Sequence, residues 1–253
     1  MSFDTAWLDL REPADHAARD GTLLARAQEH LAGTYNPLVV DLGCGTGSTF
    51  RALGAVSTKW LLIDHDEALL AEARRRCGAD VSTVALDLGD PRCIPLDVTR
   101  LVTASALIDL VSAEWIDAFV ARLAAQRIGL YSALNYDGAM QWVPADATDS
   151  AVVTAFNRHQ HGDKGFGPAL GPQGGSHLTD ALRRHGFAVT TAPSPWILDR
   201  SQAELQSVLL KGIAGAAIEA GCSEADGWLN RRLDALPNLR GRIGHLDVLA
   251  LPA

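Results

Sequence analysis

The residues best suited to bind a ligand form a glycine-rich turn directly after a short apolar run. Gly43, Gly45 and Gly47 stand at alternate positions, and Asp41 comes two residues before the first of them. Glycine has no Cβ, so such a turn can bend sharply and let its backbone approach a ligand closely. The spacing differs from the dinucleotide fingerprint G-x-G-x-x-G, because Ser48 stands where the third glycine would be. No G-K-[ST] follows, so the turn does not match a phosphate-binding P-loop.

Two further carboxylates each follow an apolar run. Asp64 comes after the run 60–63, and Asp87 comes after the run 81–86. A carboxylate can accept hydrogen bonds from two neighbouring hydroxyl groups at once. If both runs are parallel strands, both acids lie at the carboxyl edge of one sheet, which is where ligands bind in open α/β folds.

Alternation of apolar runs with helical periodicity explains how these residues would be positioned. We expect strands at 37–42, 60–63, 81–86, 101–104 and 128–134, and helices at 48–53, 67–77 and 113–126. Asp66 and Ser112 are the expected N-caps of the last two helices. This alternation predicts βαβ units and a mostly parallel sheet with helices on both faces.

The alternation stops after residue 136. Residues 137–175 are expected to form a loop insertion, with one helix at 150–159, that acts as a lid. A helix at 178–185 stopped by Gly186, a sixth strand at 187–191 and a seventh at 243–251 complete the sheet.

Two helical segments are expected to lie outside the sheet. Residues 1–33 would form an N-terminal helical cap, and residues 198–240 a helical insertion between the sixth and seventh strands. Two S-x-x-[ED] patterns predict capping boxes for helices at 202–220 and 224–236, the first from Ser201 with Glu204 and the second from Ser223 with Asp226.

Together these residues resemble the class I S-adenosylmethionine (SAM)-dependent methyltransferases, roughly over residues 38–136. The resemblance implies a Rossmann-like, seven-stranded sheet in a single domain of residues 1–253. SAM would be the cofactor and S-adenosylhomocysteine (SAH) the product. In that family a [DE]-x-G-x-G-x-G turn wraps the methionine and ribose part of SAM. An acid after the second strand binds the ribose hydroxyls, and one after the third binds the adenine amino group. The cofactor-binding residues implied are Asp41, Gly43, Cys44, Gly45, Gly47, Asp64, His65, Asp87, Leu88 and Ser105.

Methyl transfer by in-line displacement needs a base only if the acceptor must lose a proton. Asp109 follows the fourth strand, a segment that borders the methyl-transfer site in the family, although a cap or salt bridge is an equal interpretation. His159 and His161 are further catalytic candidates, in a polar stretch with glycine hinges that could close over an acceptor and exclude water. The same histidines with Asp163 could ligate a metal, but no third ligand is fixed, so no metal site is predicted.

Aromatic and basic side chains outside the sheet are the candidates for acceptor binding. Four tryptophans fall in regions that would converge above the carboxyl edge, namely Trp7, Trp142, Trp196 and Trp228. Ordinary packing is the simpler interpretation for any single one of them. The predicted acceptor-binding set takes Trp142 and Trp196 and adds Tyr136, Arg11 and Arg19. Either arginine could pair with the methionine carboxylate or an acidic acceptor, or could be a surface charge.

Composition limits the partners and the compartment. The 253 residues carry a formal net charge of −8, which argues against nucleic acid or an anionic membrane surface. Four cysteines without C-x-x-C spacing, no signal peptide and no long apolar stretch predict a cytoplasmic protein. The strong preference for Arg over Lys is typical of a bacterial, GC-rich gene.

Three functions stay open at this level. The first is methylation of a small molecule on oxygen or nitrogen, by a monomer or homodimer. The second is methylation of RNA or protein, although Ser105, Ala106 and Leu107 stand where base-methylating relatives carry N-P-P-[YF]. The third is a SAM-binding regulatory protein without catalysis. A hydride-transferring dehydrogenase is a remote fourth.

Overall fold

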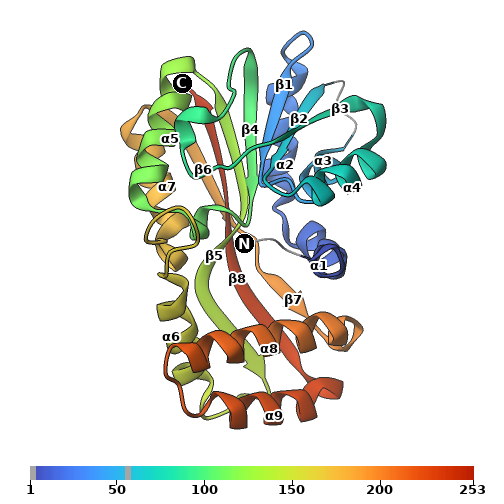
Figure 1. The fold of residues 1–253 in the computed structure, drawn as a ribbon, viewed down its shortest axis with the longest axis vertical. Helices are drawn as coiled ribbons and strands as arrows, with labels where there is room; N and C mark the ends of the chain where they lie inside the picture. Colours follow the sequence, from blue (N-terminus) through green and yellow to red (C-terminus); the bar gives the residue numbers. More distant parts are fainter. Residues whose placement is uncertain (1–3, 55–57) are drawn as a thin grey trace.

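The computed structural model describes residues 4–54 and 58–253, and these residues build an eight-stranded sheet (Figure 1). The strand order is β3-β2-β1-β4-β5-β8-β6, with β7 paired to β8. The strands are β1 (Leu38–Leu42), β2 (Lys59–Asp64), β3 (Val81–Ala85), β4 (Thr99–Ser105), β5 (Gly129–Val143), β6 (Phe187–Pro193), β7 (Trp196–Leu198) and β8 (Arg240–Pro252).

The first five strands run parallel, and β8 runs antiparallel between β5 and β6. The mostly parallel, Rossmann-like sheet is therefore confirmed, but the predicted number of seven strands is wrong. The extra strand is β7, three residues long, which pairs with the far half of β8. The carboxyl ends of the parallel strands meet at one edge, as the sequence predicts.

Helices cover both faces of the sheet because successive strand residues point to opposite faces. Val40 packs in a core with α5 and α7, and Val39 packs in another with α2, α3 and α4. The helices are α1 (Thr5–Ala18), α2 (Gly21–Ala32), α3 (Ser48–Leu53), α4 (Glu67–Cys77), α5 (Ala113–Gln126), α6 (Asp149–Gln160), α7 (Gly174–Arg184), α8 (Ala203–Glu219) and α9 (Ala225–Ala235). No helix of the described part has both the length and the apolar character that a bilayer span requires.

Two predicted N-caps are confirmed. The Asp66 carboxylate accepts from the backbone N–H groups of Ala68 and Leu69, and α4 begins directly after it. The Ser112 hydroxyl accepts from the Trp115 N–H, and α5 begins at Ala113. Such caps satisfy backbone donors that the first helical turn leaves free.

The segment 137–175 is not mainly a loop, so that part of the expectation is wrong. Strand β5 continues to Val143, well beyond the predicted end at 134, and α6 fills 149–160. The extension pairs with β8 through two irregularities, between Ser132 and Asn135 and between Tyr136 and Met140. Paired in this way, β5 and β8 leave the main sheet together and run toward α8 and α9 (Figure 1).

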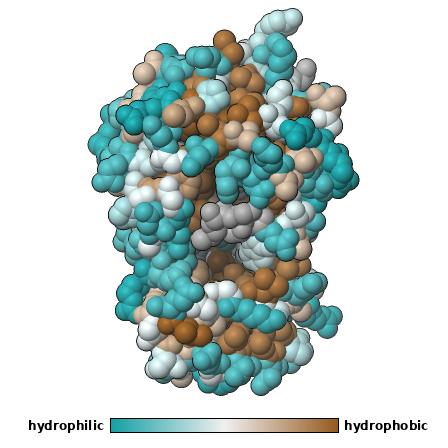
Figure 2. Space-filling model, viewed as in Figure 1, coloured by the Kyte–Doolittle hydropathy of each residue, from teal (hydrophilic) through white to brown (hydrophobic). Residues whose placement is uncertain are grey.

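The outer halves of β5 and β8, with β7, α6, α8 and α9, form what we call the helical lobe. It has a core of its own, which includes Trp142, Trp196 and Trp228. Figure 2 shows the surface hollowed between this lobe and the sheet on the face drawn.

Neither predicted capping box forms. The Ser201 hydroxyl instead donates to Asp199, and the box is made by Asp199 with Gln202 on a short 3₁₀ turn before α8. Helix α9 begins at Ala225 after Glu224, without a side-chain cap bond.

Candidate functional site

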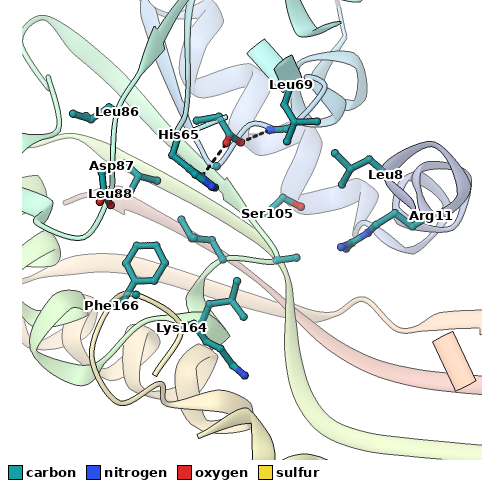
Figure 3. A pocket seen from close by; sticks show the side chains of 17 residues that line it. Leu8, Arg11, His65, Leu69, Leu86, Asp87, Leu88, Ser105, Lys164 and Phe166 are labelled. Carbon is teal, nitrogen blue, oxygen red and sulfur yellow. Dashed lines mark hydrogen bonds and ion pairs between the residues drawn. The ribbon is translucent and has the colours of Figure 1, made fainter. Parts of the chain in front are cut away.

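A cavity of about 270 Å³ opens at the carboxyl ends of β1 to β4 (Figure 3). It is covered from one side by α1 and from another by residues 164–166. Its lining is Leu8, Arg11, Gly43, Gly45, Asp64, His65, Leu69, Leu86, Asp87, Leu88, Ser105, Ala106, Leu107, Leu110, Lys164, Gly165 and Phe166. Seven of the ten predicted cofactor-binding residues are therefore brought together at this one cavity.

The glycine turn needs the conformational freedom that its sequence provides. Gly43 and Gly45 have φ angles of +62° and +53°, in the left-handed region that favours glycine. A Cβ on Gly45 would lie 3.1 Å from a methyl of Leu8 on α1. The lack of a side chain on Gly45 therefore lets Leu8 of α1 pack closely against the turn.

Asp64 organises this edge of the cavity from the end of β2. One carboxylate oxygen accepts from the Gly45 N–H at 2.9 Å, and the other accepts from the Asp66 N–H at 3.1 Å. The His65 ring lies 3.3 Å from the same carboxylate (Figure 3). A carboxylate has about four lone-pair positions, so it can still accept from a ligand.

Asp87 stands after β3 on the same side of the cavity. One oxygen accepts from the Gly89 N–H at 2.8 Å, which shapes the turn that follows. Next to it, the Leu88 carbonyl accepts from the Trp115 indole N–H at 2.7 Å, so α5 fixes this segment. Figure 3 shows Asp87 and Leu88 on the far side of the cavity from Arg11.

Asp41, Cys44 and Gly47 do not line the cavity. Asp41 is buried on β1, where it accepts from the Thr103 hydroxyl at 2.6 Å, and burial raises its pKa to about 7. Burial likewise raises the pKa of the Cys44 thiol. Gly47 has φ +87°, and a Cβ there would lie 2.5 Å from Sγ of Cys77. These three residues belong to β1 and the glycine turn but lie behind the cavity lining. A direct contact with a ligand stays a prediction for them.

Arg19 follows α1 and is buried directly beneath the cavity wall. One of its terminal nitrogens donates to the hydroxyl of cavity-lining Ser105 at 3.1 Å and lies 3.4 Å from that of Thr49. The Nε and the other terminal nitrogen are buried and have no partner in the part of the chain that the structure describes. Arg19 is therefore a buried cation with hydrogen-bonding capacity to spare.

Arg11 lines the cavity directly and connects it to the helical lobe. Its guanidinium pairs with Asp15 at 2.8 Å and lies 5.2 Å from the ring centre of Trp196. The Trp196 indole donates to the same Asp15 at 3.0 Å. In Figure 3 the Arg11 side chain reaches from α1 toward the middle of the cavity.

Asp109 follows β4 in a short 3₁₀ turn, next to cavity-lining Leu110. One carboxylate oxygen is buried without a partner among residues 4–54 and 58–253. Burial raises the Asp109 pKa to about 6, while backbone hydrogen bonds at Asp109 and Tyr136 and the Arg11 charge act in the lowering direction. Of the predicted catalytic residues, it is the one that lies beside the cavity.

His159, in the last turn of α6, and His161, directly after that helix, do not line the cavity. His159 lies 2.9 Å from Glu219 on α8, and the His161 ring lies 3.2 Å from the carbonyl of Ala169. Within the described residues no group of three His, Cys, Asp or Glu side chains is placed to hold a metal ion.

The predicted aromatic residues divide into two groups. Trp142 contacts Trp228 with ring centres 5.4 Å apart, and both are buried in the helical lobe. Tyr136 and Trp196 instead flank His245, with ring centres 6.3 Å and 5.2 Å away. Trp142, Tyr136 and Trp196 all belong to the buried core of the helical lobe, and Trp196 also contacts Arg11, so acceptor binding stays a prediction for them.

Sequence reasoning did not single out three residues of this region. Leu8 of α1 and Phe166 of the predicted lid both line the cavity. The sequence predicts a cap and a lid as segments, but not which of their residues would face the cavity. His245 lies on β8, more than a hundred residues from its neighbour Tyr136 on β5. Its place follows from strand pairing, for which the local sequence carries no signal.

Comparison with known proteins gives one family match. Residues 39–126 match the family model described as a methyltransferase domain. This span holds the glycine turn, Asp64, Asp87 and β4. No curated protein matches the sequence.

Solved structures similar to this chain share its fold at low sequence identity. The cyclopropane synthase MmaA2 of Mycobacterium tuberculosis has a TM-score of 0.53 and 11% identity, over 98% of this chain and 94% of its own. The YcgJ protein of Bacillus subtilis has a TM-score of 0.54 and 12% identity, over 92% and 100%. Geranyl diphosphate methyltransferase, solved in complex with SAM, has a TM-score of 0.51 and 13% identity, over 92% and 85%.

Proposed function

We propose that this chain, whose residues 39–126 match a methyltransferase domain, is a class I SAM-dependent methyltransferase that methylates an oxygen or nitrogen atom of a small molecule. The observation that carries the proposal is the cavity itself. There the glycine turn and the acids after β2 and β3 face a cover made by α1 and residues 164–166. At about 270 Å³, the cavity lies near the lower end of the usual range for small-molecule sites.

The residues at the cavity fit the cofactor. SAM, when bound, supplies a methyl group that is already activated on a sulfonium. Asp64 would accept from the ribose hydroxyls, and Asp87 from the adenine amino group. The unpartnered N–H groups of Arg19 would meet the methionine carboxylate through charge-assisted hydrogen bonds. Gly43 and Gly45 would let the backbone approach closely.

Asp109 is the proposed general base. Its neighbour Leu110 lines the cavity, and one Asp109 oxygen is buried without a partner in the described chain, so this carboxylate could accept a proton from an acceptor hydroxyl or amine. With a pKa of about 6 it is ionised at neutral pH and is a stronger base than an exposed aspartate.

Residues 163–168 are proposed to exclude water from the reaction. The Asp163 carboxylate accepts from the N–H groups of Gly165 and Gly167 at 2.7 Å and 3.1 Å, which holds the segment in a tight turn. The ring of Phe166 then lies against Trp115 of α5, with centres 6.2 Å apart. Together with α1, this turn covers the cavity and would shield a bound cofactor and a small acceptor from water. The net charge of −8 argues against a nucleic-acid acceptor.

Incubation with methyl-labelled SAM and a cell metabolite extract tests the proposal. We expect label in a small product, with a rate that falls about tenfold per pH unit below pH 6, as Asp109 becomes protonated. Asp109→Asn should lose most of the rate while still binding SAH. Label found only in RNA or protein would contradict the assignment of the acceptor, and unchanged turnover of Asp109→Asn would contradict that of the base.

A further inference from the structure

A second cavity lies in the helical lobe, where β8 begins. Its volume is about 360 Å³, and its lining is Asp199, Arg200, Pro237, Asn238, Leu239 and Arg240. These residues come from the 3₁₀ turn before α8 and from the segment that joins α9 to β8. None of them lines the cavity at the carboxyl ends of the parallel strands. The second cavity is therefore a separate feature, formed where two segments distant in the sequence meet.

Three arginine side chains at this cavity have no partner of their own. Arg200 and Arg240 line it, and Arg242 lies two residues further along β8, on the same face as Arg240. Within residues 4–54 and 58–253, none of the three donates a hydrogen bond or forms an ion pair. Every other arginine of the chain does one or both. In a chain with a net charge of −8, a group of unpaired guanidinium ions indicates that an anion from outside belongs there.

One buried side chain fixes the backbone that carries Arg200 and Arg240. Gln206 of α8 is 1% exposed, and its amide nitrogen donates to the carbonyl of Asp199 at 2.7 Å and lies 3.5 Å from the carbonyl of Leu239. These two carbonyls belong to the residues directly before the two arginines. The two segments are therefore held together before any ligand arrives, which reduces the entropy lost on binding.

The carboxylate of Asp199 belongs to the same lining but does not neutralise it. One of its oxygens accepts from the backbone N–H of Ser201 at 2.8 Å and from the Ser201 hydroxyl at 2.7 Å. The lining therefore carries two cations against one anion, and Arg242 adds a third cation beside them. Asn238 contributes an amide group, whose NH₂ can also donate to an anion.

We propose that this cavity binds a phosphate group, held by Arg200 and Arg240 with the charge of Arg242 beside them. A guanidinium offers two parallel N–H donors, and a phosphate has three terminal oxygens, so two arginines can bind one phosphate. A carboxylate has only two oxygens and is satisfied by one arginine. The phosphate could belong to a soluble ester or to a lipid headgroup, which present the same chemistry. This inference goes beyond the proposed function and does not depend on it.

Titration of ¹⁵N-labelled protein with glycerol 3-phosphate tests the site, and the arginine Nε–H signals are the readout. We expect saturable shifts at Arg200 and Arg240, and much weaker binding of succinate, a dicarboxylate dianion, at pH 7. Arg200→Gln and Arg240→Gln should each weaken binding roughly three- to tenfold, the range for a lost hydrogen bond, and the double variant should abolish it. Arg183→Gln, which removes an exposed arginine of α7, is the matched control and should bind as the native protein does.

Vesicles distinguish the two sources of the phosphate. Sedimentation with phosphatidic acid in phosphatidylcholine vesicles, lost in the double variant, would assign the site to a lipid headgroup. Binding of glycerol 3-phosphate without sedimentation would assign it to a soluble ester. Binding of neither probe, equal binding of succinate, or binding that survives the double variant would overturn the phosphate site. SAH titration of the same samples tests the proposed function separately, because the two cavities share no residue.

Discussion

Asp41 and Asp64 are the same residue type at the ends of neighbouring strands, yet their surroundings separate their roles. Asp64 accepts from two backbone N–H groups and lines the cavity. Asp41 is fully enclosed, accepts one hydrogen bond from Thr103, and leaves its second oxygen unpartnered among residues 4–54 and 58–253. The first carboxylate is held by backbone donors at the cavity, whereas burial raises the pKa of the second and favours its neutral form.

The raised pKa of Asp41 predicts a pH-dependent gain in stability for Asp41→Asn. A carboxyl whose pKa is about 7 in the folded protein and 3.8 in the unfolded chain destabilises the fold increasingly as pH rises between those values. Asparagine keeps an acceptor for the Thr103 hydroxyl and removes the charge. In ligand-free protein, we expect the variant to be more stable by roughly 1–3 kcal/mol at pH 8, and nearly equal at pH 4.

Denaturant unfolding at both pH values measures this difference. Asp180→Asn, on the exposed face of α7, serves as the control and should change stability little at either pH. A variant Asp41→Asn that is less stable than the native protein at pH 8 would show that the buried carboxylate is charged and well paired.

At the scale of single residues, the sequence predicts much of the cavity lining. Gly43, Gly45, Asp64 and Asp87 are recognisable because they follow predicted strands at a short, regular spacing. The place of His245 beside Tyr136 is not recognisable, because it depends on strand pairing across more than a hundred residues. His159 lies outside the cavity lining, where it pairs with Glu219, so a catalytic role for it stays a prediction.

Secondary-structure elements were predictable where one local signal decides them. The caps at Asp66 and Ser112 and the first four strands fall within two residues of their predicted places. The long extension of β5 was missed because Asn135, Asp137 and Gly138 break the alternation expected of a strand. In the structure they fall at or beside the two irregularities in the pairing with β8. At the first irregularity the Asp247 carboxylate accepts a hydrogen bond from the Leu134 N–H at 2.8 Å.

The helical lobe depends on one buried ion pair between α6 and α9. Arg232 is 2% exposed, pairs with Asp149, donates to the Pro144 carbonyl at 2.6 Å and lies 5.3 Å from the ring centre of Trp142. The Trp228 indole also donates to Asp149. The Asp149 side chain is 19% exposed, so loss of the guanidinium would leave a largely buried carboxylate without its cation.

Arg232→Leu should therefore destabilise the protein by about 3 kcal/mol, as expected when one partner of a buried pair is removed. Arg183→Leu is the matched control, because Arg183 forms an exposed pair with Asp180 at 3.7 Å and should contribute less than about 1 kcal/mol. Denaturant unfolding compares the two. Equal losses would mean that the pair at Arg232 does not hold the lobe together.

The whole molecule combines a sheet whose carboxyl edge holds the cavity with the helical lobe. The two parts share the long strands β5 and β8 (Figure 1), and Arg11 of α1 both lines the cavity and lies over Trp196 of β7. Loop variation on such a scaffold lets one cofactor site serve many acceptors. The fold class was predictable because apolar runs alternate with helical segments through most of the sheet. The helical lobe was not predictable, because its core forms between segments that are far apart in the sequence.

Calorimetric titration with SAH tests the central claim most directly. We predict saturable binding at one site, weakened roughly 10- to 150-fold by Asp64→Ala, which corresponds to the 1.5–3 kcal/mol of hydrogen bonds to a charged group. Part of this loss would come from the Gly45 turn that Asp64 holds. Asp180→Ala should bind as the native protein does. The absence of any heat of binding to the folded native protein, or equal affinity of Asp64→Ala, would contradict the account.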